Sequence, residues 1–164
     1  MKEIKLESTI IVHDNFQAFD DKTTELILLA KKASTNAYAP YSQFFVGAAV
    51  LLDDGSMVEG NNQENAVYPL GLCAERVALF SAHSRFPKNT VKAIAITIDY
   101  DRIATDQAAF PCGSCRQSIS EFENIFDQKI KIYILAKGEK VLEIESIQQL
   151  LPFAFTKELL NGAG

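Results

Sequence analysis

Cysteine occurs three times in the sequence, at positions 73, 112 and 115, and the last two form a C-x-x-C pair. An odd number of cysteines is a poor disulfide framework, especially where the first residues do not resemble a secretory leader. Three interpretations compete: unrelated buried thiols, a redox-active C-x-x-C pair, or three thiolate ligands of one metal ion. The places of the cysteines in the predicted elements favour the third.

The composition predicts a soluble single domain. The chain has 164 residues, is 48% hydrophobic and 23% charged, and so can bury one core. Sixteen Lys and Arg against 21 Asp and Glu give a net charge of −5, which argues against a nucleic-acid partner. No apolar run approaches the roughly 20 residues of a membrane span. We therefore expect a cytoplasmic protein with no nucleic-acid or membrane partner.

Apolar periodicity predicts strands that alternate with helices. Asp20 or Asp21 caps a helix whose apolar face continues to about residue 36. The nearly unbroken apolar run 44–52, a turn at 53–56 and the segment 57–60 predict a hairpin at the centre of a sheet rather than at its edge. The remaining predicted elements are an extended arm or strand at 3–12, helices at 73–85 and 112–126, strands at 91–98, 130–136 and 141–144, and short helices near 146–151 and 156–161.

This order of elements predicts an α/β fold. Helices that alternate with strands cover both faces of a sheet, and the hairpin makes that sheet mixed rather than parallel. We expect a three-layer α/β/α sandwich with about five strands. Residues 1–20 are expected to form an N-terminal extension and residues 21–164 the domain.

The cysteines lie at the starts of two predicted helices. Helix N-termini present free N–H groups and a positive dipole end, which lower the pKa of a thiol. Two such starts that face each other would gather three thiolates, whereas a redox C-x-x-C pair would leave Cys73 without a role. Three protein ligands leave the fourth zinc position open, as in catalytic sites. His83 is about 15 Å along its helix from Cys73 and too far away to complete the site, while the spacing does not exclude His13.

Two short segments resemble the zinc-dependent nucleoside and nucleobase deaminases. Cys73-Ala74-Glu75 and Pro111-Cys112-Gly113-Ser114-Cys115 match the H-x-E…P-C-x-x-C signature, in which His or Cys is the first ligand. Further segments are similar to cytidine deaminases, namely residues 38–44, 47–49, 62–65, 73–76, 115–117 and 150–155. The resemblance covers about residues 22–160 and is to the short, three-cysteine, homotetrameric branch of that family. It implies the cytidine deaminase-like form of the α/β/α fold.

The resemblance implies roles for the signature residues. Cys73, Cys112 and Cys115 would hold one Zn²⁺ per chain, which would lower the pKa of a bound water toward ~7. Glu75 would take the water proton, pass it to N3 of cytosine and later protonate the leaving amine. Without the cysteines, Glu75 would be interpreted as a complement to its helix dipole.

Two arginines follow the ligands. Three thiolates on one divalent cation leave a net charge of −1, which a nearby cation should offset. By resemblance, Arg76 does so through hydrogen bonds to ligand sulfurs. Arg116 could assist, and a surface salt bridge is the alternative interpretation of both side chains.

Specificity is expected to come from other segments. In the family, residues that match Asn62 and Glu64 hold the 3′-hydroxyl of the ribose, and a residue that matches Phe44 packs against the base. From the sequence alone, Phe44 is equally a core strand residue. The backbone N–H of Ala74 would read the pyrimidine edge. Phe155 matches a C-terminal aromatic residue that enters a neighbouring subunit's site, and Tyr68 resembles an interface residue.

Two features depart from the family pattern. Residues 1–20 extend the usual N-terminus and could add an edge strand or an interface arm. Residues 68–72 contain Pro69 and Gly71 ahead of the first ligand and could reshape the loop over the pocket, which affects the substrate range.

The expected function is hydrolytic deamination of cytidine and 2′-deoxycytidine to uridine and 2′-deoxyuridine in pyrimidine salvage. One alternative is a deaminase of another aminopyrimidine, such as blasticidin S or a modified cytidine. A second is a polynucleotide-editing deaminase, which the net charge disfavours. A third is a non-enzymatic binding module with a structural zinc, which would need a fourth protein ligand.

Overall fold

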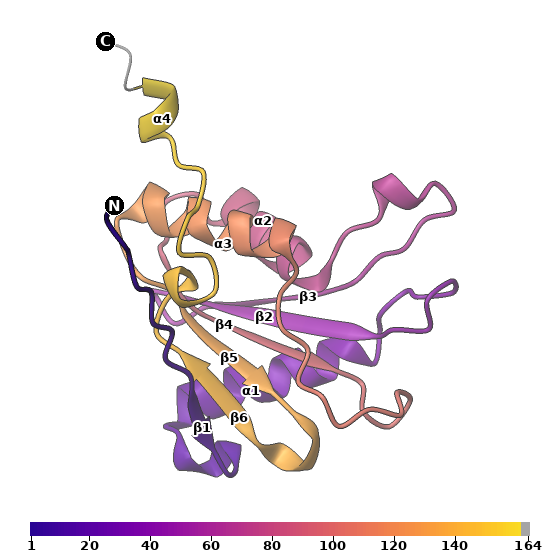
Figure 1. Cartoon of the computed structure of the whole chain (residues 1–164). Coiled ribbons are helices and arrows are strands. Elements are labelled where there is room, and N and C mark those ends of the chain that lie inside the picture. The colour runs from indigo at the N-terminus through magenta and orange to yellow at the C-terminus, as the bar shows by residue number, and fades with distance from the viewer. Residues whose placement is uncertain (162–164) are drawn as a thin grey trace.

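A mixed six-stranded sheet with the order β1-β6-β5-β4-β2-β3 organises the computed structural model, which describes residues 1–161 (Figure 1). β4 and β5 run parallel, and the other neighbouring strands are antiparallel. The strands are β1 (Ile11–His13), β2 (Val46–Leu52), β3 (Met57–Asn61), β4 (Val91–Ile98), β5 (Lys131–Leu135) and β6 (Val141–Ile144). The helices are α1 (Asp21–Ser34), α2 (Ala74–Arg85), α3 (Gly113–Phe126) and α4 (Glu158–Asn161), with short 3-10 helices such as η2 (Tyr68–Leu70) and η4 (Ile147–Gln149).

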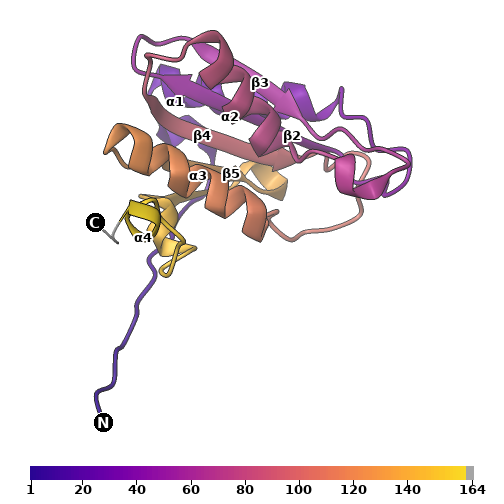
Figure 2. The same ribbon diagram turned by 90° about the horizontal axis from the view of Figure 1, so that it is seen from above.

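The sheet has helices on both faces, which confirms the predicted three-layer α/β/α sandwich. α1 covers one face, and α2 and α3 lie side by side on the other (Figures 1 and 2). On the α1 face, Leu26, Ile27 and Ala30 pack against strand residues that include Ala49 and Tyr133. The larger core lies under α2 and α3. None of the helices between residues 1 and 161 combines the length and the apolar character that crossing a lipid bilayer requires.

Two glycines let the helices lie close to the sheet. A Cβ atom at Gly47 in β2 would lie 2.1 Å from the carbonyl oxygen of Ala30 in α1. A Cβ atom at Gly60 in β3 would lie 2.5 Å from the backbone nitrogen of Ala78 in α2. Any larger side chain would push the helices away, so these glycines set the distances of α1 and α2 from the sheet. The position of α2 in turn sets the position of Cys73 at its start.

The sheet differs from the prediction at its two edges. The hairpin does not lie at the centre, because β4 pairs with β2 and leaves β3 as an edge strand. The unbroken apolar run belongs to β2 alone, whereas in β3 the exposed Glu59 lies between two buried residues, as is usual at an edge. At the other edge, β1 adds a sixth strand by pairing with β6. Within the predicted segment 3–12, only the last two residues belong to this strand.

Candidate active site

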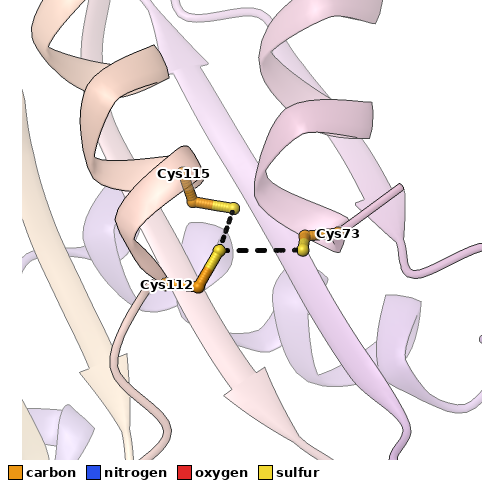
Figure 3. A group of neighbouring side chains, drawn as sticks. All are labelled: Cys73, Cys112 and Cys115. Carbon is orange, nitrogen blue, oxygen red and sulfur yellow. Dashed lines mark hydrogen bonds between the residues drawn. The ribbon is translucent and has the colours of Figure 1, made fainter. Parts of the chain in front are cut away.

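Three sulfur atoms meet where the first turns of α2 and α3 face each other. Cys73 and Cys112 are the N-cap residues of these helices, and Cys115 lies buried in the first turn of α3. Sγ of Cys112 lies 4.0 Å from Sγ of Cys73 and 3.5 Å from Sγ of Cys115. All three sulfurs lie within 4.8 Å of one another, and Figure 3 shows the side chains pointing toward a common point.

The local backbone leaves these thiols available. Carbonyl oxygens of Cys73 and Cys112 accept the first helical hydrogen bonds from the N–H groups of Val77, at 3.1 Å, and Arg116, at 2.9 Å. Neither cysteine side chain accepts a capping hydrogen bond from its own helix. The backbone therefore starts the helix while the sulfur is directed at the other two thiols.

The thiols ionise unequally. A hydrogen bond from the Cys115 thiol, helped by one from Arg76, lowers the pKa of Cys73 to about 5 despite its partial burial. The same hydrogen bond and burial raise the pKa of Cys115. Negative charge in the cluster is therefore favoured at Cys73 over Cys115, and binding of a metal ion would release the remaining thiol protons.

This donor set fits zinc. Thiolates are preferred zinc ligands, and three of them on preformed helix starts leave one tetrahedral position open. Neither histidine belongs to the cluster. His13 bonds to Glu143 at the β1 edge, at 2.9 Å, and His83 packs against the rings of Phe122 and Phe126.

Glu75 lies beside the cluster as the second residue of α2. Its side chain is 5% exposed, yet it contributes to the wall of a cleft of about 500 Å³ that also reaches Cys73 and Cys112. Burial is the main cause that raises the pKa of this carboxyl, and the negative charge of Cys73 adds to it. A carboxyl group so placed faces both the sulfurs and the open cleft.

Arg76 follows Glu75 in α2 and contacts Cys73. Its Nη2 atom donates to Sγ of Cys73 at 3.8 Å, and this hydrogen bond raises the pKa of the guanidinium group. Arg116 is arranged differently, because its Nε and Nη1 atoms donate to the carbonyl oxygens of Pro111 and Leu150, at 2.8 and 2.9 Å. Of the two arginines, only Arg76 donates a hydrogen bond to a sulfur atom within residues 1–161.

The cleft joins two groups of predicted residues. We call Cys73, Glu75, Cys112 and Cys115 the thiol corner, and Phe44, Asn62, Glu64 and Tyr68 the rim. All four rim residues line the cleft together with Cys73, Glu75 and Cys112. Ala74 is fully buried behind them at the start of α2. Phe155 does not line this cleft, and its ring is 57% exposed on the C-terminal segment.

Hydrogen bonds fix the polar side chains of the rim. The Glu64 carboxylate accepts from the backbone N–H groups of Tyr41, at 2.9 Å, and Ser42, at 3.2 Å, and also from the Ser42 hydroxyl. The Asn62 amide accepts from the Val46 N–H and donates to the Phe44 carbonyl, both at 2.8 Å. Asn62 therefore holds the chain at the start of β2, which positions Phe44. That residue precedes the strand and is not a core residue.

Phe110 and Ala109 line the cleft from the long connection between β4 and α3, and neither was expected from the sequence. Gly71 and Leu72 belong to the loop that was expected over the pocket, and they line the cleft ahead of Cys73. These connections have no hydrophobic period. The one available signal was the position of Phe110 directly before the Pro111-Cys112 motif.

Comparison with known proteins agrees with this geometry. Residues 20–130 match the family model described as "Cytidine and deoxycytidylate deaminase zinc-binding region". The chain belongs to this family. It is 43% identical over 136 residues to the cytidine deaminase of Halalkalibacterium halodurans, which covers 83% of this chain and 96% of that protein. It is 42% identical over 140 residues to the cytidine deaminase of Sporosarcina psychrophila, and the match covers 85% of this chain and 95% of that protein.

Solved structures of the family share the fold. The crystal structure of the cytidine deaminase from Burkholderia pseudomallei superimposes with a TM-score of 0.67 at 38% identity, and covers 80% of this chain and 97% of that chain. The crystal structure of the cytidine deaminase from Mycobacterium tuberculosis gives a TM-score of 0.64 at 33% identity, and covers 84% of this chain and 99% of that chain. Family membership thus confirms the predicted fold class and assigns a zinc-binding function to the region of the three-cysteine cluster.

Proposed function

We propose that this chain hydrolyses cytidine and 2′-deoxycytidine to uridine and 2′-deoxyuridine, with release of ammonia, in pyrimidine salvage. Membership of the family and relatives above 40% identity support cytidine deaminase activity. The observation that carries the proposal is the arrangement of the thiol corner, in which three sulfurs converge and two of them, those of Cys73 and Cys112, line a single cleft with the buried carboxyl of Glu75.

In this proposal, Cys73, Cys112 and Cys115 hold one Zn²⁺ per chain. Zinc so bound supplies a water whose pKa is lowered toward ~7 and which can attack at neutral pH. Arg76 offsets the excess negative charge of three thiolates, through its hydrogen bond to Sγ of Cys73.

Glu75 carries the protons. Deamination forms a bond between a water oxygen and C4 of the base and breaks the bond from C4 to the amino nitrogen. Glu75 takes a proton from the attacking water and delivers it to N3, then takes the second proton of that water from the hydroxyl group now on C4 and passes it to the departing amine, which leaves as ammonia while C4 becomes a carbonyl carbon. Burial beside the cleft favours this role, because it raises the pKa of the carboxyl and so makes the carboxylate a better proton acceptor.

The rim binds the nucleoside. Glu64 and Asn62 hold the 3′-hydroxyl of the ribose, Phe44 packs against the base, and the N–H of Ala74 reads the pyrimidine edge. The carboxylate of Glu64 is already oriented by the Tyr41–Ser42 backbone, which supports a binding role without reorganisation.

We further propose that the sites are shared in a homotetramer. Phe155 would enter a neighbouring subunit's cleft and Tyr68 would lie at the interface. Both rings are exposed in the single chain, and Tyr68 is already at the cleft mouth. The three free thiols suit a reducing compartment, which supports the cytoplasm as the location.

A substrate panel tests the proposal. The zinc-loaded protein is incubated with cytidine, 2′-deoxycytidine, cytidine monophosphate and blasticidin S, and the ultraviolet change of deamination is followed beside a Glu75→Ala control. We expect turnover of the first two compounds by the wild type alone. Turnover of blasticidin S in their place would contradict the substrate, and equal turnover by both proteins would contradict the role of Glu75.

A further inference from the structure

Residues 1–19 precede the segment that matches the family model, so the family does not explain them. In the structure they first pass the C-terminal segment and then run along the β6 side of the sheet (Figures 1 and 2). Residues 8–13 contact β6 and η4, whereas Phe16 and Phe19 pack against the core on the α1 face.

β1 anchors this N-terminal segment to the sheet. Ile11 pairs with Glu143 and His13 with Val141 in antiparallel register. Nε2 of His13 lies 2.9 Å from Oε2 of Glu143, and the His13 ring packs on Phe19 with a centroid separation of 4.5 Å. The segment is therefore tied to the fold on its C-terminal side, which fixes the direction of residues 8–10.

Residues 8 and 9 hold Gln149 at two points. The Ser8 hydroxyl donates to the Gln149 backbone carbonyl at 2.7 Å, and the Thr9 N–H donates to the Gln149 side-chain oxygen at 2.8 Å. Gln149 ends η4, at the start of the segment that leads to Phe155. The two hydrogen bonds thus fix both the backbone and the side chain of this residue.

α3 holds the same segment further along. Arg116 donates to the Leu150 carbonyl at 2.9 Å. The Gln117 amide donates to the Phe155 carbonyl at 2.6 Å and accepts from the Phe155 N–H at 3.4 Å. The segment 149–155 is therefore held at its first residues and at Phe155, with the Phe155 ring left facing solvent.

We propose that residues 8–13 are a positioning element for the segment that carries Phe155. This inference rests on the proposed entry of Phe155 into a neighbouring subunit's cleft. A flexible segment would lose conformational entropy each time it became ordered on binding. Hydrogen bonds that already hold Gln149 reduce this loss. The N-terminal segment therefore affects substrate binding in another subunit through the position of Phe155, and it does not itself contact the substrate.

Gln149→Ala removes the acceptor of the Thr9 N–H, and Gln148→Ala is its matched control. The Gln148 side chain is exposed and makes no hydrogen bond to any other part of residues 1–161. A deletion of residues 2–10 is the second variant. We expect Gln149→Ala and the deletion to raise the KM for cytidine about three- to tenfold, as the loss of one or two hydrogen bonds would. We expect kcat to change less than about twofold, because the thiol corner is untouched, and Gln148→Ala to match the wild type.

The Gln149→Ala substitution made in a Phe155→Ala protein distinguishes a failure of the positioning role from a failure of the role of Phe155. We expect Gln149→Ala to add nothing there, because its effect passes through Phe155. If Phe155→Ala raises KM but Gln149→Ala behaves like Gln148→Ala, the positioning role is wrong and the role of Phe155 stands. A Gln149→Ala effect that persists in full in that background also overturns the inference. If Phe155→Ala leaves KM unchanged, the role of Phe155 falls and the inference falls with it.

Discussion

The thiol corner and the rim face the same cleft, but they are assembled differently. Each residue of the thiol corner lies at an N-cap or in the first turn of α2 or α3, where the helix fixes its backbone. The residues of the rim lie outside the longer helices and the strands, and Glu64 and Asn62 are held there by side-chain hydrogen bonds to the backbone of other segments. In the proposed assembly, only the rim is completed by other chains. Chemistry is therefore preorganised within one chain, while recognition depends on how segments are held.

Substitution of a ligand should have the largest effect. Cys115→Ala removes the most buried of the three thiols. We expect loss of zinc binding and a fall in kcat on the order of 10⁴-fold, because the source of an acidic water is lost. Zinc content measured by atomic absorption and turnover of cytidine check this. A variant that keeps both would break the assignment of the corner as a metal centre.

Arg76 should affect the metal less. Arg76→Gln removes the donor to Sγ of Cys73. We expect zinc affinity, measured by competition with a chelator, to fall about 10- to 100-fold. Arg85→Gln is the control, since that guanidinium lies at the other end of α2, over the ring of Phe86. Equal effects of the two variants would mean that only the net charge matters.

A rim variant should change binding and leave the metal in place. Glu64→Gln keeps the side-chain shape but removes the negative charge, and we expect the KM for cytidine to rise about 10- to 100-fold with zinc unchanged. With 3′-deoxycytidine, which lacks the hydroxyl that Glu64 is proposed to hold, wild type and variant should converge. A variant that discriminates between the two nucleosides as well as the wild type does would contradict this role.

The smallest effect is expected outside both regions. Asp20 caps α1 on the opposite face of the sheet, where its carboxylate accepts from the Thr23 N–H at 3.0 Å. This hydrogen bond lowers the pKa of Asp20. A carboxyl with a lowered folded-state pKa stabilises the fold above its ordinary pKa, and this contribution is lost as pH falls through the folded value.

Asp20→Ala should therefore cost about 1 kcal/mol of unfolding free energy near pH 7, and less at pH 3. Urea unfolding at the two pH values measures this, and the KM for cytidine should stay unchanged. A change in KM would show that α1 is coupled to the cleft. It would contradict the expectation that substrate binding depends on the residues of the rim and not on the opposite face of the sheet.

Sequence reasoning succeeded where the pattern is local. The starts of α1, α2 and α3, the residues of β4 and β6 and the convergence of three cysteines all follow from caps, periodicity or a short motif. It failed where pairing between distant segments decides. Glu59 is the one residue of β3 that favours an edge position, and it does not by itself determine that β4 pairs with β2. The pairing of β1 with β6 joins residues about 130 positions apart. Phe110 could not be predicted for the same reason, because its loop reaches the cleft only in the folded chain.

The central claim is that the thiol corner performs the chemistry and that Glu75 is its proton carrier. Glu75→Gln tests it most directly, because the amide keeps the size of the side chain and cannot carry the proton. Zinc per chain and the rate of cytidine conversion are measured side by side for this variant and the wild type. We predict one zinc per chain in both proteins and a fall in kcat of about 10²- to 10⁴-fold in the variant. A Glu75→Gln protein that binds zinc and converts cytidine at the wild-type rate would contradict the claim.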